Sequence, residues 1–288
     1  MTPRTSSETP RALDLEAEYN NRARVPEHST IFARWTREAE NFRARHADAE
    51  RNLAYGRGAR ETIDLFWPVA GREAPIVLFV HGGYWRSLSP AMFSQVAAGA
   101  NAHGLAVALA GYDLCPAVTV ASIIEEAREA AVFLWRRHGR KLLACGWSSG
   151  GHLVACLLAT DWKRRTPDLP ADLVPAAFSI SGLFDLSPLL DTSMNADLRL
   201  DAAAARLASP LFWELPAGAR AFDAWVGGRE SGEFRRQSRV VADVWGKKGV
   251  AARYGEVAGA DHFTVLDPLA DPKSAMTARL VELARSIG

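Results

Sequence analysis

The sequence predicts an α/β fold with a mostly parallel sheet, because short apolar runs alternate along the chain with longer segments of helical periodicity. The apolar runs are too short for helices and rich in β-branched residues, which indicates buried strands. They lie at residues 75–80, 105–110, 142–146, 176–180, 221–226 and 252–257. Helices are expected at residues 121–137, 152–159, 233–245 and 273–287. No internal repeat or low-complexity linker divides this pattern, so one main domain is expected.

The segment before this pattern has a different character. Residues 1 to about 12 are polar and are expected to be frayed. Leu13–Asn52 is rich in Ala, Arg and Glu with periodic apolar residues, which predicts helices interrupted at Pro26. We therefore expect residues 1–50 to form a helical extension packing on the functional site, and residues 51–288 to form the domain.

Two further segments complete the predicted architecture. Arg51–Tyr55 and Glu61–Phe66 flank a Gly-Arg-Gly turn and predict a β-hairpin. The stretch of residues 185–218 lacks a strand of its own, although it lies between two predicted strands. An insertion of this length usually lies over a site, so we expect it to form a short cap.

Composition excludes several classes of function. The 288 residues carry 34 Lys and Arg against 33 Asp and Glu, a net charge of +1 that argues against nucleic acid as a partner. No apolar run approaches the roughly 18 residues that span a bilayer, so no membrane partner is expected. Three cysteines do not make a disulfide framework, and the N-terminus lacks the apolar core of a secretory signal, which together predict a cytoplasmic protein. The expected partner is a small molecule, and a homodimer is one assembly that the sequence allows.

The strongest chemical motif is Gly146-Trp147-Ser148-Ser149-Gly150, which follows a predicted strand and precedes a predicted helix. It fits the pattern G-x-S-x-G, in which a sharp turn projects the central serine above the sheet. Side chains two positions away would collide, so glycines are needed there. Centring the motif on Ser149 would place Trp147 at a glycine position, so Ser148 is the predicted nucleophile.

A second motif, His81-Gly82-Gly83-Tyr84-Trp85, follows the strand at residues 75–80. Two glycines at a strand end let backbone amides face a ligand, which is the form of an oxyanion hole. The alternative is an ordinary Gly-Gly turn. That alternative weakens because the serine motif lies two strands downstream, in the order that this chemistry requires.

The general base is predicted from its place in the chain. His262 lies in Gly259-Ala260-Asp261-His262-Phe263, after the last predicted strand and before the last helix. None of the other six histidines follows a strand at the sheet edge where the serine is expected, except His81 in the Gly-Gly turn.

The acid that orients this histidine is expected after the next-to-last strand, where Glu230 is the first carboxylate. Glu233 is a rival, but it opens the next helix, where an acidic residue favours the helix dipole. Asp223 lies too early, inside the strand. His152 and Cys156 are four residues apart on a helix, but two ligands without further support are a weak signal for a metal.

Taken together, the motifs resemble those of the kynurenine formamidase (arylformamidase) family, an H-G-G-x-W branch of the α/β-hydrolase fold. The resemblance includes His81–Trp85, the segment Glu230–Ser238, the Gly259–Phe263 loop and the early segment Glu16–Pro26. It implies that Ser148, Glu230 and His262 form a catalytic triad. It also implies that the amides of Gly83, Tyr84 and Ser149 form the oxyanion hole, with no metal or other cofactor.

The resemblance implies a serine hydrolase that cleaves N-formylkynurenine to kynurenine and formate through an acyl-enzyme. A carboxylesterase for short acyl esters, or a hydrolase of another aryl amide, is the alternative, and a non-catalytic protein that binds a small ligand is an alternative of another class. Trp147 stands where many relatives have histidine, and the carboxylate is Glu where others have Asp. Nine tryptophans and 12 phenylalanines suggest an aromatic pocket. Its expected substrate-binding residues are Trp85, Trp147, Trp213 and Phe263.

Overall fold

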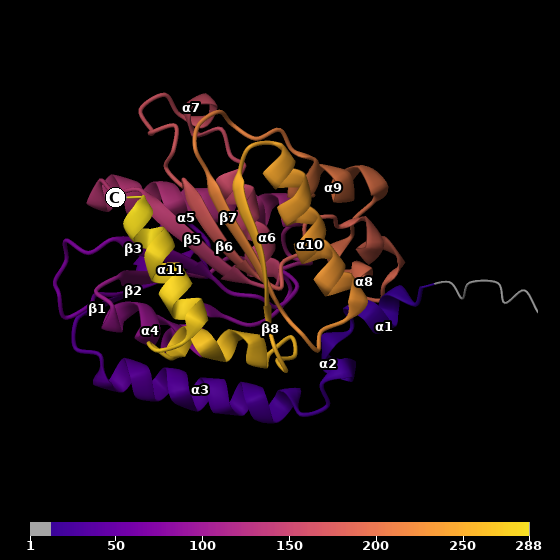
Figure 1. Ribbon diagram of the computed structural model, residues 1–288, viewed down its shortest axis with the longest axis horizontal. Coiled ribbons are helices and arrows are strands. Elements are labelled where there is room, and N and C mark those ends of the chain that lie inside the picture. Colours follow the sequence, from indigo (N-terminus) through magenta and orange to yellow (C-terminus); the bar gives the residue numbers. More distant parts are fainter. Residues whose placement is uncertain (1–12, 288) are drawn as a thin grey trace, which may run out of the picture.

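The computed structural model describes residues 13–287, which form an eight-stranded sheet between two layers of helices (Figure 1). The strands follow the order β1-β2-β4-β3-β5-β6-β7-β8 across the sheet. Their bounds are β1 Ala49–Ala54, β2 Thr62–Phe66, β3 Ile76–Val80, β4 Ala106–Ala110, β5 Leu142–Trp147, β6 Ala176–Ile180, β7 Ala221–Gly227 and β8 Ala251–Val257. β2 is antiparallel to both β1 and β4, and all other neighbours are parallel, so the predicted mostly parallel α/β sheet is confirmed.

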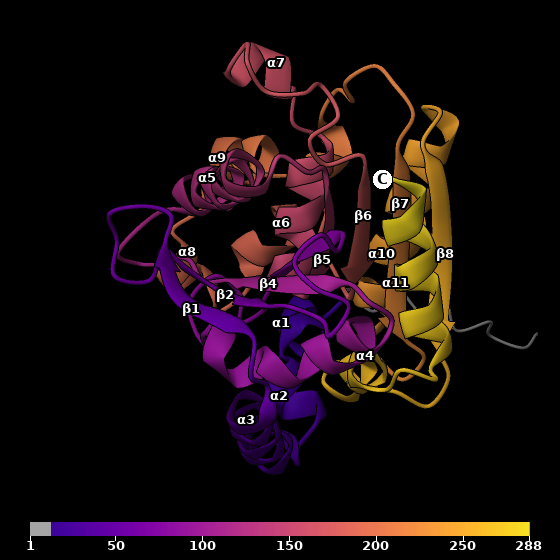
Figure 2. The same cartoon turned by 90° about the vertical axis from the view of Figure 1, so that its left-hand side faces the viewer.

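The helices divide between the two faces of the sheet. Their bounds are α1 Leu15–Tyr19, α2 Asn21–Arg24, α3 His28–Arg45, α4 Ala97–Ala102, α5 Val120–His138, α6 Ser149–Leu158, α7 Trp162–Arg165, α8 Asn195–Leu198, α9 Ala202–Leu207, α10 Gly232–Lys247 and α11 Ala275–Ser286. Four 3-10 helices complete the described structure: η1 Pro90–Val96, η2 Ser187–Asp191, η3 Pro210–Phe212 and η4 Thr264–Ala270. Figure 2 shows α6 and α11 on opposite sides of the sheet.

Successive side chains along a strand point to opposite faces of the sheet, so the protein has two apolar cores, one between the sheet and each layer of helices. In β3, Ile76, Leu78 and Val80 belong to the core under α5, α6 and α10, whereas Val77 and Phe79 belong to the core under α4 and α11. Every residue of β3 is buried, which explains why its sequence is a continuous apolar run.

The central parallel pairing brings the two predicted motifs together. β3 pairs with β5 in a register that places Val80 opposite Gly146. Both strands run in the same direction, so the segment that starts at His81 and the turn at Ser148 leave the sheet side by side. This is the edge at which open α/β sheets hold their ligands.

The N-terminal segment departs from the prediction at one point. The interruption at Pro26 is confirmed, since α2 ends at Arg24 and α3 begins at His28. The prediction that helical structure reaches Asn52 was wrong. α3 ends at Arg45, and β1 begins at Ala49, which pairs with Phe66 of β2. Pairing with β2 outweighs the helical composition of these residues. The expected fraying of residues 1 to about 12 lies outside the described residues.

The insertion at residues 185–218 contains η2, α8, α9 and η3 and no strand within its bounds. Across residues 13–287, no helix is both long and apolar enough to cross a membrane.

Burial of His152 makes stability depend on pH. This α6 residue is fully buried, and its Nε2 atom lies 2.7 Å from the carbonyl oxygen of Ala208. Burial lowers its pKa from 6.5 to about 4. Between these two pKa values the unfolded chain binds a proton that the folded protein does not, so the free energy of unfolding falls as the pH falls.

We therefore expect His152→Gln to flatten the acid side of the stability curve. Between pH 7 and pH 5 the free energy of unfolding of the wild type should fall by about 2 kcal/mol more than that of the variant, which lacks this proton. Urea denaturation at both pH values measures the difference. Equal pH dependence of the two proteins would contradict the assigned burial effect.

Candidate active site

A strained turn presents Ser148 at the end of β5. Ser148 lies between the last residue of β5 and the first residue of α6, with φ 57° and ψ −122°, a conformation that side chains rarely adopt. A Cβ atom on Gly146 would lie 2.3 Å from the carbonyl oxygen of Gly150. A Cβ atom on Gly150 would lie 2.0 Å from the carbonyl oxygen of Val80 in β3. The first glycine thus permits the turn itself, and the second permits its packing against the neighbouring strand.

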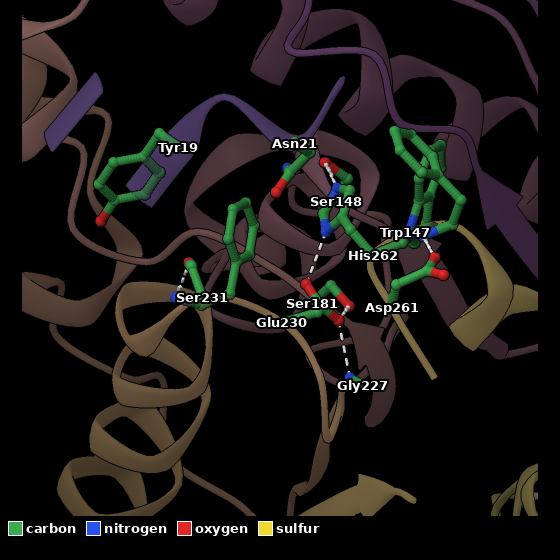
Figure 3. A network of polar contacts seen from close by, with 12 residues as sticks. Tyr19, Asn21, Trp147, Ser148, Ser181, Gly227, Glu230, Ser231, Asp261 and His262 are labelled. Atoms are coloured by element: carbon green, nitrogen blue, oxygen red, sulfur yellow. Dashed lines mark hydrogen bonds and ion pairs between the residues drawn. The ribbon is translucent and has the colours of Figure 1, made fainter. Parts of the chain in front are cut away.

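Three side chains from distant parts of the chain meet at this turn. The Nε2 atom of His262 lies 3.1 Å from the Oγ of Ser148, and its Nδ1 atom lies 2.6 Å from Oε2 of Glu230 (Figure 3). All three residues are at most 5% exposed. This is the geometry in which a histidine can take a proton from a serine while a carboxylate fixes its tautomer and orientation.

The second oxygen of Glu230 is held by the sheet edge. Oε1 accepts a hydrogen bond of 2.5 Å from the hydroxyl of Ser181 and one of 2.7 Å from the amide of Gly227. Ser181 follows β6 directly and has a φ of 52°. Its hydroxyl therefore orients the carboxylate that contacts His262. No sequence motif marks Ser181 for this role.

The two other carboxylates considered at this position have different partners. Glu233 accepts two hydrogen bonds from Arg236, at 2.6 and 2.7 Å, and these are the main cause of its lowered pKa. Asp223 lies in β7 and forms an ion pair with Arg279 of α11 at 2.9 Å. Glu230 is thus the one of the three that contacts His262.

The segment His81–Trp85, which we call the oxyanion segment after its expected role, places backbone amides beside the serine. Gly83 and Tyr84 have φ values of 117° and 50°, and a Cβ atom on Gly82 would lie 2.8 Å from the Cβ of Ser148. Within residues 13–287, the amides of Gly83, Tyr84 and Ser149 donate no hydrogen bond. They are free to bind an oxyanion.

Trp147 links the serine turn to the histidine loop. Its indole Nε1 donates a hydrogen bond of 2.8 Å to the carbonyl oxygen of His262. Its ring centroid lies 5.2 Å from that of His262 and 6.1 Å from that of Phe263. Trp147 therefore both holds the histidine loop and forms part of the wall beside it.

A cavity of about 310 Å³ opens over this site. Its lining combines aromatic side chains with residues of the N-terminal segment, of the loop after Trp85 and of the insertion. Its lining includes Glu16, Tyr19, Asn21, Arg22, Phe32, Tyr84, Arg86, Trp147, Ser193, Met194, Asp197, His262 and Phe263. A larger cavity of about 660 Å³ is lined by Glu230 and Asp261 and shares His262 and Asn21 with the first, but neither Trp147 nor Tyr84 lines it. The smaller cavity is therefore the one that a substrate of Ser148 would occupy.

Two of the four expected substrate-binding residues do not line this cavity. Trp85 is fully buried, and its ring packs at 4.9 Å against His152 beneath the oxyanion segment. Trp213 lies at the end of the insertion, where its indole donates to the carbonyl oxygen of Leu207 and its ring faces Arg128. The prediction was wrong for both residues, because a place next to a motif or within an insertion does not determine where a side chain points.

Sequence reasoning missed the side chains that attach the N-terminal segment to the oxyanion segment. The hydroxyl of Tyr84 donates a hydrogen bond of 2.6 Å to the carbonyl oxygen of Tyr19 and lies 3.4 Å from Nδ2 of Asn21. Asn21 lies beside Ser148 and His262 (Figure 3). The early Glu16–Pro26 resemblance was the only signal for these residues.

Tyr19 is itself anchored on α10. Its hydroxyl donates a hydrogen bond of 2.8 Å to Glu233 and accepts one of 3.0 Å from Gln237. Burial is the main cause that raises the pKa of Tyr19 well above its ordinary value of 10, so the hydroxyl stays protonated and can donate. A buried tyrosine thus connects α10, the N-terminal segment and the oxyanion segment.

In the described part of the chain, His152 and Cys156 have no third side chain with which to form a metal site. Their Nε2 and Sγ atoms are 3.5 Å apart. Among residues 13–287, no group of three or more His, Cys, Asp or Glu side chains could hold a metal ion.

Comparison with known proteins gives consistent relatives. A family model described as alpha/beta hydrolase fold matches residues 77–266. Kynurenine formamidase of Salmo salar is 29% identical over 269 residues, which cover 90% of this chain and 88% of the relative. Kynurenine formamidase of Danio rerio is 28% identical over 239 residues, which cover 81% of this chain and 80% of the relative. These likenesses confirm the resemblance predicted from the motifs.

Solved structures agree with this fold. The crystal structure of a provisionally assigned thioesterase from Silicibacter sp. has a TM-score of 0.84 and 34% identity, and the match covers 92% of this chain and 98% of that chain. An esterase of the bacterial hormone-sensitive lipase family has a TM-score of 0.66 and 19% identity over 91% of this chain and 98% of that chain, a likeness of fold alone.

The anchoring of Tyr19 can be tested through stability. We expect Tyr19→Phe to lower the free energy of unfolding by about 1–2 kcal/mol, because it leaves buried polar partners on α10 without the hydroxyl. Urea denaturation measures the loss. Tyr254→Phe is the matched control, since Tyr254 also bonds a glutamate, Glu256, but at the exposed edge strand β8. Equal losses in the two variants would contradict the anchoring role.

Proposed function

Because the chain belongs to the α/β-hydrolase family, we propose that it is a serine hydrolase in which Ser148 is the nucleophile, His262 the general base and Glu230 the orienting acid. The contacts of His262 with Ser148 and Glu230 are the single observation that carries this proposal. A protein that only binds a ligand has no need of this arrangement, which argues against the non-catalytic alternative.

The reaction proceeds in two steps at this site. Ser148 Oγ attacks the substrate carbonyl carbon while His262 Nε2 takes the hydroxyl proton. His262 then gives that proton to the leaving amine or alcohol, which leaves an acyl-serine. Water, activated by the same histidine, attacks the acyl-serine and releases the acid. The amides of Gly83, Tyr84 and Ser149 stabilise the negative charge on the carbonyl oxygen in both steps.

We propose an N-formyl arylamine, with N-formylkynurenine as the leading example, as the substrate. Two relatives named kynurenine formamidase cover most of this chain, and the cavity is walled by Phe32, Trp147 and Phe263. In this reaction the acyl group on Ser148 is formyl and the leaving group is the aromatic amine. Hydrolysis of the formyl-serine releases formate and restores the free enzyme. The small volume of the cavity favours a substrate with one aromatic ring.

A second candidate is the hydrolysis of short acyl esters or thioesters. The relative with 34% identity carries a provisional thioesterase assignment, and the same triad chemistry would cleave either bond. Substrate preference, and not mechanism, separates the two candidates.

We further propose that the enzyme works in the cytoplasm on a small molecule, without a cofactor. The buried free thiols of Cys115, Cys145 and Cys156 support a reducing compartment. Near-neutral charge supports an uncharged or small partner over nucleic acid.

The substrate proposal predicts the order of rates. We expect kcat/KM for N-formylkynurenine to exceed that for phenyl acetate by at least tenfold. The aromatic amine is a poorer leaving group than phenolate, but specific binding of the formamide in the transition state should more than compensate. Formation of kynurenine and of phenol, followed by absorbance, gives both values. A formamide turned over more slowly than the ester would favour the esterase candidate.

The catalytic proposal predicts the effect of Ser148→Ala. Removal of the hydroxyl should lower kcat by at least a thousandfold for every substrate, because only binding and the oxyanion amides remain. p-Nitrophenyl acetate provides the assay. Ser29→Ala is the control, because it makes the same replacement at an exposed position of α3 and should leave the rate unchanged. Comparable rates for Ser148→Ala and the wild type would overturn the serine mechanism.

A further inference from the structure

We propose that Arg22 selects substrates that carry a carboxylate, by binding this group at the mouth of the cavity. The inference rests on the proposed function, in which Ser148 attacks a substrate in this cavity, and it adds the chemical class of that substrate. In this class one aromatic ring carries both the reacting acyl group and a side chain that ends in a carboxylate.

A continuous aromatic wall leads from the reacting serine to Arg22. Trp147 and Phe263 lie beside His262, with ring centroids 6.1 Å apart. Phe263 contacts Phe32 edge to face at 5.2 Å. The guanidinium carbon of Arg22 lies 5.8 Å from the centroid of Phe32. A substrate whose ring packs along this wall would have its acyl group near Ser148 and its carboxylate-bearing side chain directed toward Arg22.

The other charged groups of the cavity are occupied by partners. Arg86 and Asp197 form an ion pair of 2.6 Å. The carboxylate of Glu16 accepts hydrogen bonds from the amide and the hydroxyl of Ser193, at 2.8 and 3.0 Å, and these contacts help to lower its pKa.

Arg22 is the exception. Among the described residues it forms no ion pair and no hydrogen bond, and its guanidinium lies over the ring of Phe32. Among the described lining residues, Arg22 is therefore the cation that has no anionic partner and is left to bind an anion. This cation lies on the N-terminal segment, next to the ring of Phe32.

A guanidinium in this position is well suited to a carboxylate. Its planar fork can donate two parallel hydrogen bonds to the two oxygens, which a lysine ammonium cannot reproduce. The ring of Phe32 holds the guanidinium plane by a cation–π contact and so reduces the freedom lost on binding. Because Arg22 is exposed, water competes for the bond, and we expect a selectivity of about tenfold.

The test uses two aryl formamides that differ only in the amino-acid tail, which carries the carboxylate. N-Formylkynurenine carries the α-amino acid group, and N-(2-acetylphenyl)formamide has the same ring and formyl amide without it. We expect Arg22→Gln to raise KM for N-formylkynurenine about tenfold and to change kcat by less than twofold. The kinetic constants for the tailless amide should stay within twofold of the wild type. Arg22→Lys should recover part of the KM, because it keeps the charge but loses the fork.

Arg37→Gln is the matched control. It removes the same charge from an exposed position of α3 that does not line the cavity, so it should leave both substrates unaffected. An unchanged KM for N-formylkynurenine in Arg22→Gln would overturn the proposal. So would an equal loss for the two formamides, which would mean that Arg22 acts only through the fold.

A pair of esters separates this proposal from the formamidase assignment. If the wild type cleaves neither formamide, the proposed substrate fails, and 4-acetoxyphenylacetate is compared with its methyl ester. A preference of the wild type for the anionic ester that falls about tenfold in Arg22→Gln would still support anion selection. The same ester preference in the wild type and in the variant would refute it.

Discussion

The close approach of two parallel strand ends is the constraint on which the site depends. β3 and β5 pair side by side, and the turn after β5 packs against the last carbonyl groups of β3. Only a glycine at position 150 allows this contact, and only a glycine at position 146 allows the turn. Together they fix the distance between Ser148 and the free amides of Gly83 and Tyr84 that follow β3. The chemistry of the site is therefore set first by backbone geometry and only then by side chains.

The rest of the site is attached to this fixed centre by hydrogen bonds from four directions. Ser181 and the amide of Gly227 donate hydrogen bonds to the carboxylate of Glu230. The indole of Trp147 donates one to the carbonyl oxygen of His262 and so holds the histidine loop. Tyr84 ties the oxyanion segment to the N-terminal helices. The contacts of Ser181, Gly227 and Trp147 are buried and that of Tyr84 is partly buried, so a polar group without its partner would cost free energy there. The groups around the reacting serine are thus oriented before any substrate arrives.

Much of this arrangement could be predicted from local patterns. Continuous apolar runs marked the buried strands, and strand–motif–helix order brought Ser148, Glu230 and His262 to one sheet edge. The side chains that the sequence did not reveal act over long separations. Tyr19 meets Glu233 across 214 positions, and Ser181 meets Glu230 across 49, with no spacing that a single sequence could expose. The prediction that Trp85 and Trp213 line the cavity was wrong for a related reason, since neither a motif nor an insertion determines the direction of a side chain. The start of β1 was misjudged because tertiary pairing outweighed local composition.

The anchoring of Tyr19 on α10 also has a consequence for the order in which the protein is made. The N-terminal segment leaves the ribosome first, but its partners Glu233 and Gln237 are synthesised more than 200 residues later. The hydroxyl of Tyr19 therefore has neither of these hydrogen-bond partners until α10 has been synthesised, and His262 is synthesised later still. The part of the cavity wall that the first helices contribute is therefore completed late, although it is synthesised first. Contacts of such large sequence separation fold slowly, and a chain stopped before α10 would have a complete serine turn but an open, incomplete site.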